Sequence, residues 1–354
     1  MAVAAAAKTT TTSSSTMASS SAPPKMVAVV AVLLALCIIS AAGQLDVGYY
    51  NKTCPAAEQI VRNETATAIK NSPDLAAALL RLHYHDCFVQ GCDASVLLDS
   101  TPTNTAEKDS MPNGSLRGFD VVARVKDELE QACPGTVSCA DILALMARDA
   151  VSLARGPSWP VALGRRDGRT SSAASCGELP PLHADVNLLV EAFAAKGLDV
   201  KDLAVLSGAH TLGKAHCPSY ADRLYASAGC ATPDPALDAR YADRLRMRCD
   251  SASADGDGGN SSTAAAPASE LDPGSCTTFD TSYYRHVAKR RGLLRSDASL
   301  LDHRFTRAYV LHAASGRYDG HFFHDFAVSM AKMAAIGVLT GDQGEIRKKC
   351  NVVN

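Results

Sequence analysis

Helical periodicity runs through most of this chain, and it restricts the fold more than any other feature of the sequence. Apolar residues recur every three or four positions in one segment after another, whereas sustained alternation of apolar and polar residues is almost absent. Helix-start signals accompany the pattern, such as Ser138 with Asp141 three residues later, and Asp199 ahead of an apolar run. The sequence therefore predicts a mainly α domain with few, short strands.

The predicted helices share apolar periodicity and flanking cap or breaker residues. They begin near Pro55, after Ser72-Pro73-Asp74 and at Asp199, and they cover residues 119–131, 138–154, 188–196, 235–248, 280–291 and 323–336. Residues 251–269 are rich in Ser, Ala, Gly and Asp, which bury little apolar area, so we expect a flexible surface loop. The fragment 255–258 resembles a calcium loop, but Ala266 stands where such a loop needs glutamate.

The first 43 residues differ in kind from the rest. A Ser/Thr/Ala-rich lead precedes the apolar run from Val27 to Ile39, which is shorter than the about 20 residues needed to span a bilayer. Ala41 and Gly43 supply the small residues of a signal-peptide cleavage site, so residues 1–43 read as a leader and 44–354 as the mature domain. Eleven of the twelve cysteines follow the leader, which predicts disulfides and at least one unpaired thiol.

Composition excludes two classes of partner. Hydrophobic residues make up 47% of the chain and charged residues 20%, enough for a large core. The formal charge is −2 and no block of Lys and Arg occurs, so binding to nucleic acid is not expected. No second hydrophobic segment has membrane length, so we expect no membrane association after the leader is cleaved.

Residues 81–95, RLHYHDCFVQGCDAS, hold the first cluster of reactive side chains. Helical spacing of four places Arg81 and His85 on one face. An ordinary polar pair on a helix surface is the alternative interpretation, and zinc bound by His83 and His85 is another, although a spacing of two suits a strand better than a helix. Cys87 and Cys92 bracket a tight loop, and the oxygen-bearing side chains of Asp86, Asp93 and Ser95 around it outline a hard-cation site. Neither HExxH nor GxSxG occurs.

A second segment, SGAHTLGKAHC at 207–217, completes a recognisable pattern. Together the two segments resemble the distal helix and the proximal histidine segment of the class III, or secretory plant, haem peroxidases. Other landmarks of that family follow in order: EKD at 107–109, RGF at 117–119, VSCAD at 137–141, GPSW at 156–159, LGRRD at 163–167 and TGDQGEIRKKC at 340–350. The resemblance covers essentially the whole mature chain and implies a haem peroxidase fold, in which helical distal and proximal halves enclose the haem.

The resemblance also implies a role for each matching residue. His210 would be the axial ligand of the iron of one haem b, and Asp297 would accept the other N–H of its imidazole. Arg81 and His85 would act on hydrogen peroxide at the opposite haem face. Asn113 would hold the proton of His85 on the correct ring nitrogen, so we predict no glycan there. Sequons occur at Asn51, Asn63, Asn113 and Asn260.

Two structural calcium ions are implied in the same way. The distal set is Asp86, Val89, Gly91, Asp93, Ser95 and, through water, Glu107; the proximal set is Thr211, Asp272, Ser275, Thr278 and Asp280. The implied disulfides are Cys54–Cys133, Cys87–Cys92, Cys139–Cys350 and Cys217–Cys249. Cys176, Cys230 and Cys276 depart from the family pattern, and we expect Cys176 to pair with Cys230, which leaves Cys276 free. Pro180 matches the substrate-edge proline, and Tyr84 replaces the usual distal phenylalanine.

The leading hypothesis is a peroxidase, a donor:hydrogen-peroxide oxidoreductase that oxidises small phenols in one-electron steps and serves hydrogen peroxide catabolism and the response to oxidative stress. A disulfide-linked matrix protein that has lost catalysis is the second, but Arg81, His85 and His210 are all intact. A zinc hydrolase is the third. We expect a monomer secreted to the apoplast or cell wall, because the chain lacks the longer C-terminal extension of vacuolar members.

Overall fold

The computed structural model describes residues 45–225, 234–254, 267–317 and 319–354. The expected leader, the fragment 255–258, Cys230 and Asn260 lie outside these residues, as does most of the expected loop 251–269. The described helices are α2 (Ala57–Asn71), α3 (Leu75–Val89), α4 (Phe119–Ala132), α5 (Cys139–Leu153), α6 (Val186–Ala195), α7 (Val200–Ser207), α8 (Ala221–Leu224), α9 (Ala239–Ala254), α10 (Ser282–Ala288), α11 (Arg295–Ser299), α12 (Arg304–Ala313) and α13 (Asp319–Met333).

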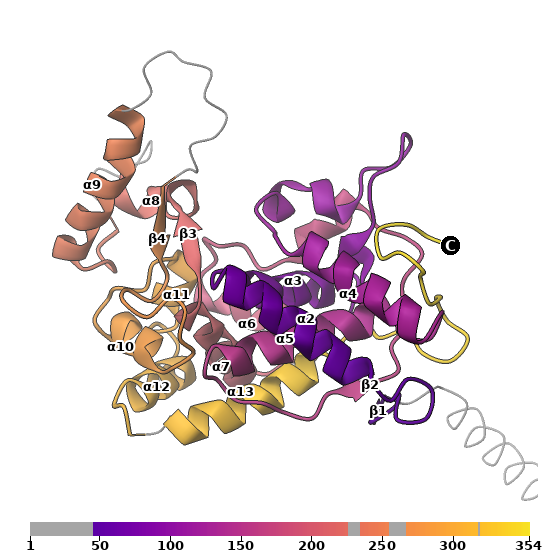
Figure 1. Ribbon diagram of the computed structural model, residues 1–354. Helices are drawn as coiled ribbons and strands as arrows, with labels where there is room; N and C mark the ends of the chain where they lie inside the picture. The colour runs from indigo at the N-terminus through magenta and orange to yellow at the C-terminus, as the bar shows by residue number, and fades with distance from the viewer. Residues whose placement is uncertain (1–44, 226–233, 255–266, 318) are drawn as a thin grey trace, which may run out of the picture. The chain divides into compact units, whose positions relative to one another are not determined.

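Strands are few and short, as the sequence predicts. In the described part of the chain, β1 (Asp46–Val47) pairs antiparallel with β2 (Ala162–Leu163), and β3 (Lys214–His216) pairs antiparallel with β4 (Ala268–Glu270). Helices α2 to α5 lie together, and β3, β4, α8 and α9 form a separate group (Figure 1). The mainly α fold is therefore confirmed.

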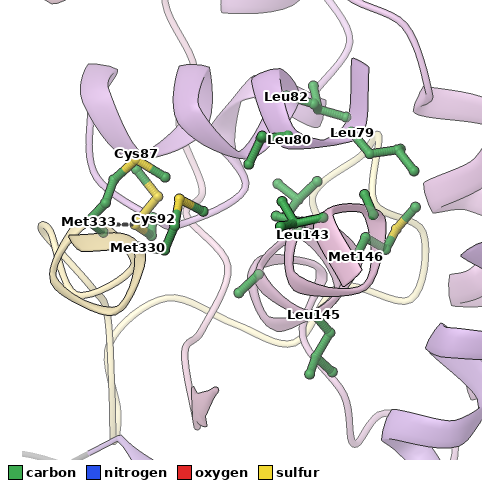
Figure 2. Packing of buried hydrophobic residues seen from close by; sticks show 14 of the residues in the cluster. Leu79, Leu80, Leu82, Cys87, Cys92, Leu143, Leu145, Met146, Met330 and Met333 are labelled. Carbon is green, nitrogen blue, oxygen red and sulfur yellow. Dashed lines mark hydrogen bonds between the residues drawn. A yellow bond between two sulfur atoms is a disulfide. The ribbon is translucent and has the colours of Figure 1, made fainter. Parts of the chain in front are cut away.

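Helix α5 is the centre of the core, and its start follows from a cap. The Ser138 hydroxyl accepts the Asp141 N–H at 3.1 Å, which satisfies one of the unpaired donors of the first turn. Every residue from Cys139 to Val151 is buried. Leu79, Leu80 and Leu82 of α3 lie on one side of this helix, as Figure 2 shows. Each buried leucine contributes about 1.5–3 kcal/mol, so α3 is held firmly at the position where it presents its polar side chains.

Helix α7 leads directly into the second polar segment. Asp199 accepts backbone N–H groups at the start of α7, and the Asp202 side chain accepts the Asp199 N–H in return, which forms a capping box. Asp202 also pairs with Lys332 of α13 at 2.9 Å. The 3-10 turn Gly208–Thr211 follows α7 without a break and contains His210. This turn packs against α7 and α10.

The sequence missed three helices and shifted the ends of others. Helices α8 and α11 have 4 and 5 residues, too short for a periodic signal. Helix α12 buries Val310 but leaves Phe305 and Leu311 exposed, so the large apolar residues of its sequence do not mark one face. Among the described residues, no helix combines the length and the apolar character needed to cross a membrane.

Candidate active site

Arg81 and His85 meet on one face of α3, as their spacing predicts. Arg81 Nε donates to His85 Nε2 at 3.0 Å, and His85 Nδ1 lies 2.6 Å from Asn113 Oδ1. Asn113 Nδ2 donates to the Glu107 carbonyl at 2.8 Å, which leaves its Oδ1 as the acceptor facing the ring. His85 therefore carries its proton on Nδ1 and presents the lone pair of Nε2.

Burial sets the protonation state of this histidine. Only 6% of His85 is exposed. Burial, reinforced by the Arg81 charge and opposed by the bond to Asn113, lowers the pKa of His85 to about 3. The imidazole is thus neutral at mildly acidic and neutral pH. Arg81 is held from the other side, because its guanidinium donates to Ser115 Oγ at 2.9 Å and to the Pro112 carbonyl at 3.1 Å.

The sequon at Asn113 provides a simple check on this geometry. Asn113 is 2% exposed, and both polar atoms of its side-chain amide are hydrogen-bonded. An oligosaccharide on Nδ2 would break the bond to Glu107 and would have no room. We expect peptide mass spectrometry of the protein expressed through a secretory pathway to find Asn113 unmodified, and a glycan at this position would contradict the arrangement.

The second histidine is bonded quite differently. His210 Nδ1 lies 2.7 Å from Asp297 Oδ1, in the first turn of α11. Asp297 is 1% exposed, and it also accepts the Tyr283 hydroxyl at 2.9 Å and the Leu294 N–H at 2.9 Å. Burial acts to raise the pKa of Asp297, but His210 and the other donors outweigh it and hold that pKa below its ordinary value. The ionised carboxylate therefore accepts the hydrogen bond from Nδ1–H, which leaves the lone pair of His210 Nε2 as the available ligand atom.

A group of buried acids gathers around the C-terminal end of α3. Asp86 and Glu107 are fully buried and Asp93 is 7% exposed. Burial and then the neighbouring Asp93 raise the pKa of Asp86 well above its ordinary value, and burial also raises the pKa of Asp93 and Glu107. Buried oxygens without a hydrogen-bond partner are Asp86 Oδ1, Ser95 Oγ and Glu107 Oε2. Unpaired oxygens and crowded carboxylates suit a hard divalent cation.

The predicted carbonyl ligands of this group, Val89 and Gly91, lie at the last residue of α3 and in the turn that follows it. Gly91 has φ +118°, and a Cβ there would come within 2.6 Å of the Gly337 carbonyl, so the turn requires glycine. The Val89 carbonyl also accepts a hydrogen bond from Lys196 Nζ at 3.0 Å, which the sequence did not indicate. Glu107 links the group to the distal histidine, because its own carbonyl accepts Asn113 Nδ2.

The second predicted acidic group surrounds the residue after His210. Thr211 Oγ1 donates to Asp272 Oδ2 at 2.9 Å and lies 3.4 Å from the Thr278 carbonyl. Ser275 Oγ donates to Asp280 Oδ2 at 2.8 Å. Burial raises the pKa of Asp272 to about 6, and its Oδ1 is buried without a hydrogen-bond partner. The five predicted proximal ligands are thus brought together.

One further side chain belongs to this group, and the sequence gives no sign of it. The Ser282 hydroxyl lies within hydrogen-bond distance of both Asp272 and Asp280 and can donate its one proton to either. It lies at the start of α10, and no motif distinguishes it from other serines of the chain.

The four disulfides pair as the resemblance implies. They are Cys54–Cys133, Cys87–Cys92, Cys139–Cys350 and Cys217–Cys249. The expected bridge between Cys176 and Cys230 is wrong, because Cys176 is a free thiol. Its sulfur instead lies 3.1 Å from Ser110 Oγ and 3.5 Å from Asn113 Nδ2, in a buried site behind the distal asparagine. Cys276 is free, as expected.

The local contacts do not favour zinc. His83, Asp86 and Cys87 offer ligand atoms close together, but Cys87 is bonded to Cys92 and has no thiolate. His83 Nδ1 lies 3.6 Å from the Cys87 sulfur, whereas His85 Nδ1 is hydrogen-bonded to Asn113. The two imidazoles therefore have different partners and do not form one metal site.

The geometry defines a class of protein. A neutral imidazole base beside a guanidinium, together with a second imidazole backed by a buried carboxylate, is the residue set of a haem peroxidase. The peroxidase family model matches residues 61–316. Peroxidase 1 of Oryza sativa subsp. japonica is 54% identical over 325 residues, which are 91% of this chain and 97% of that relative. Peroxidase 27 of Arabidopsis thaliana is 50% identical over 310 residues, 88% and 92% of the two chains.

The chain therefore belongs to the class III plant haem peroxidases and is a peroxidase that acts on hydrogen peroxide. Membership in this family implies haem and, usually, calcium.

Proposed function

We propose that the chain uses one haem b and hydrogen peroxide to oxidise small phenolic donors by one-electron steps, and that it serves hydrogen peroxide catabolism and the response to oxidative stress. The observation that supports this most is the different bonding of two histidines. His85 offers a neutral Nε2 beside Arg81, and His210 is bonded through Nδ1 to a buried carboxylate. One is arranged as a base and the other as a metal ligand.

The residues fit a haem iron. His210 keeps Nδ1 on Asp297 while 34% of its side chain stays exposed, so Nε2 is the atom that would bind iron. A carboxylate behind the ligand fixes the tautomer and raises the basicity of the imidazole. When bound, haem supplies the reduction of peroxide and the one-electron oxidation of donors.

The distal residues would move the proton and stabilise charge. His85 Nε2 takes a proton from hydrogen peroxide and returns it to the departing oxygen, so that water leaves. Arg81, whose Nε lies 3.0 Å from that nitrogen, stabilises the negative charge that develops as the O–O bond breaks. Asn113 is a positioning residue, because its Oδ1 keeps the proton of His85 on Nδ1.

We further propose that both acidic groups bind calcium. Each contains at least one buried oxygen without a hydrogen-bond partner, and each adjoins a functional histidine: Asp86 follows His85, and Thr211 follows His210. A bound divalent cation would relieve carboxylate repulsion and hold both histidines in place. Calcium here is structural.

Calcium removal should destabilise the protein. A ligand at a thousandfold excess over its Kd contributes about 4 kcal/mol to the free energy of unfolding. We expect chelation to lower the thermal midpoint by on the order of 8 °C, reversibly on calcium addition. Scanning calorimetry of the holoenzyme measures this. The Asp86→Asn variant should respond less, while Asp120→Asn, at a side chain that is 73% exposed, should respond as wild type does. An unchanged midpoint after chelation would remove calcium from the account.

The family resemblance is the basis for two further proposals, on where donors dock and on where the protein is located. We propose that small phenols dock near the half-buried Pro180 and that the chain is a secreted monomer. The Tyr84 ring contacts the His85 ring edge-on, with centroids 5.4 Å apart. We propose that the Tyr84 hydroxyl influences which donors and peroxides react. Burial raises the pKa of Tyr84 well above its ordinary value, which keeps the phenol protonated.

An assay of the secreted, haem-loaded chain tests the proposed function. We expect oxidation of a small phenol such as guaiacol that requires hydrogen peroxide and ceases when the peroxide is consumed. A chain that holds haem but oxidises no phenol would leave the matrix-protein hypothesis standing instead.

A further inference from the structure

A continuous row of aromatic rings leads away from His210. The ring of Tyr283 meets His210 edge-on with centroids 6.0 Å apart, Tyr284 follows at 5.1 Å, and Tyr309 follows Tyr284 at 5.8 Å. Tyr283 and Tyr284 are fully buried on α10, whereas Tyr309, on α12, is partly exposed. Helices α10 and α12 pack against each other (Figure 1). The row therefore connects the proposed iron ligand with the protein surface.

Carboxylates lie at both ends of this row. Tyr283 donates to Asp297 Oδ1 at 2.9 Å, and Tyr309 donates to Asp325 Oδ2 at 3.1 Å. Asp325 is held in turn by Lys201 Nζ at 2.7 Å. A phenol that gives up an electron also gives up its proton, so a neighbouring carboxylate is the group that such an oxidation needs. Burial and Asp325 raise the pKa of Tyr309 well above its ordinary value, which keeps the phenol protonated beforehand.

The middle ring has a different partner. Tyr284 donates to the Ala204 carbonyl at 2.9 Å. A backbone carbonyl is no base, so Tyr284 would pass an electron onward without holding the oxidation. This leaves Tyr309 as the outer position where an oxidised ring, its deprotonating group and solvent come together.

We propose that Tyr309 is a second oxidation site, for phenols attached to a polymer that is too large to reach the haem. One electron passes from Tyr309 through Tyr284 and Tyr283 towards the cofactor bound by His210, and the phenolic proton moves to the Asp325 carboxylate. The tyrosyl radical then takes one electron and one proton from a donor phenol. Tyr309 is restored, the donor becomes a phenoxyl radical, and Asp325 releases its proton. Two such events consume one hydrogen peroxide and form two waters. This inference rests on the proposed function.

The surface next to Tyr309 suits an aromatic donor. Phe305 lies one turn earlier on α12, on the same face by helical spacing, and is 55% exposed. The Arg304 guanidinium lies over the Phe305 ring at 4.7 Å. An exposed ring with a cation over it, one turn from Tyr309, gives a polymer-bound phenol a surface on which to stack.

Three variants of the haem-loaded protein test the proposal. Tyr309→Phe removes the oxidisable hydroxyl, and Tyr309→Trp keeps an oxidisable ring. Tyr225→Phe is the matched control, because Tyr225 is an exposed tyrosine that also donates to a carboxylate, Asp250, but lies outside the row. Two readouts are used. One is the tyrosyl radical trapped after peroxide addition without donor, followed by electron paramagnetic resonance and by spin-trap mass spectrometry. The other is the oxidation of guaiacol and of a phenol coupled to dextran.

Wild type and Tyr225→Phe should give a spin-trap adduct on Tyr309 and oxidise both donors. Tyr309→Phe should lose that adduct and most of the rate on dextran-bound phenol while it keeps the guaiacol rate, and Tyr309→Trp should recover the dextran-bound rate. An undiminished dextran-bound rate in Tyr309→Phe, or no dextran-bound rate in wild type, overturns the inference. Failure of wild type with guaiacol would instead count against the proposed function. A normal haem absorption spectrum in each variant confirms that it is folded.

Discussion

Replacing His85 with alanine is expected to slow the reaction with hydrogen peroxide by about 10²–10⁴-fold, the usual contribution of a general acid–base residue. The reason is specific to the bonding of this side chain. Its proton is fixed on Nδ1 by Asn113 and its pKa is lowered to about 3, so Nε2, which accepts the Arg81 N–H, stays unprotonated over the working pH range. Stopped-flow measurement of the peroxide reaction isolates this step from donor oxidation.

The control for this variant is His324→Ala, which removes an exposed imidazole. It should react with peroxide as wild type does. The pH dependence adds a second check, because a base with a lowered pKa is lost only as the pH falls through that low value. The wild-type rate should therefore stay level down to about pH 4, since the pKa of His85 is about 3. An alanine variant with the wild-type rate would show that His85 is not the base.

The second large effect is expected at His210. We propose a single bond between the chain and the iron, which His210 Nε2 makes. The His210→Ala variant should therefore lose most of its bound haem rather than merely react slowly. The haem content per chain after gel filtration measures this, again with His324→Ala as the control. Imidazole added to the solution should restore part of the haem binding, because the space that the side chain leaves can accept a free ligand.

The Asp297→Asn variant distinguishes two roles of the His210–Asp297 pair: holding the haem and setting the reduction potential of its iron. It should keep the haem, because Nε2 of His210 is untouched. It should also raise the reduction potential of the iron, because a neutral amide makes His210 a weaker donor to oxidised iron than the carboxylate does.

If His210→Ala retained a full complement of haem, the axial role would belong to another residue.

Local signals predict much of this fold. Ser138 and Asp199 cap helices where their patterns indicate, and the four-residue spacing of Arg81 and His85 places them in contact on α3. These features depend on residues within one helical turn of each other. Helix α12 was missed because its apolar residues do not share one face: Val310 is buried, whereas Phe305 and Leu311 are exposed.

The rest of the site depends on contacts between distant segments. Asn113 lies 28 residues from His85, and Asp297 lies 87 residues from His210, so no periodicity relates them, and only the family resemblance pointed to both pairs. Where the chain departs from its family, the resemblance gave no guidance. Cys176 proved to be a free thiol against Asn113. The hydrogen bond from Tyr283 in α10 to Asp297 in α11 joins residues 14 positions apart, and neither helix carries a motif that indicates it.

The absorption spectrum of the purified, haem-supplied chain tests the central claim most directly, namely that His210 binds haem iron while His85 stays free to act on peroxide. We expect a Soret band, one haem per chain, and a spectrum of ferric iron with one histidine ligand that changes on addition of one equivalent of hydrogen peroxide. A protein that takes up no haem when haem is supplied would contradict the account. A spectrum of iron bound by two histidines would contradict it equally, because His85 would then be a ligand and not a base.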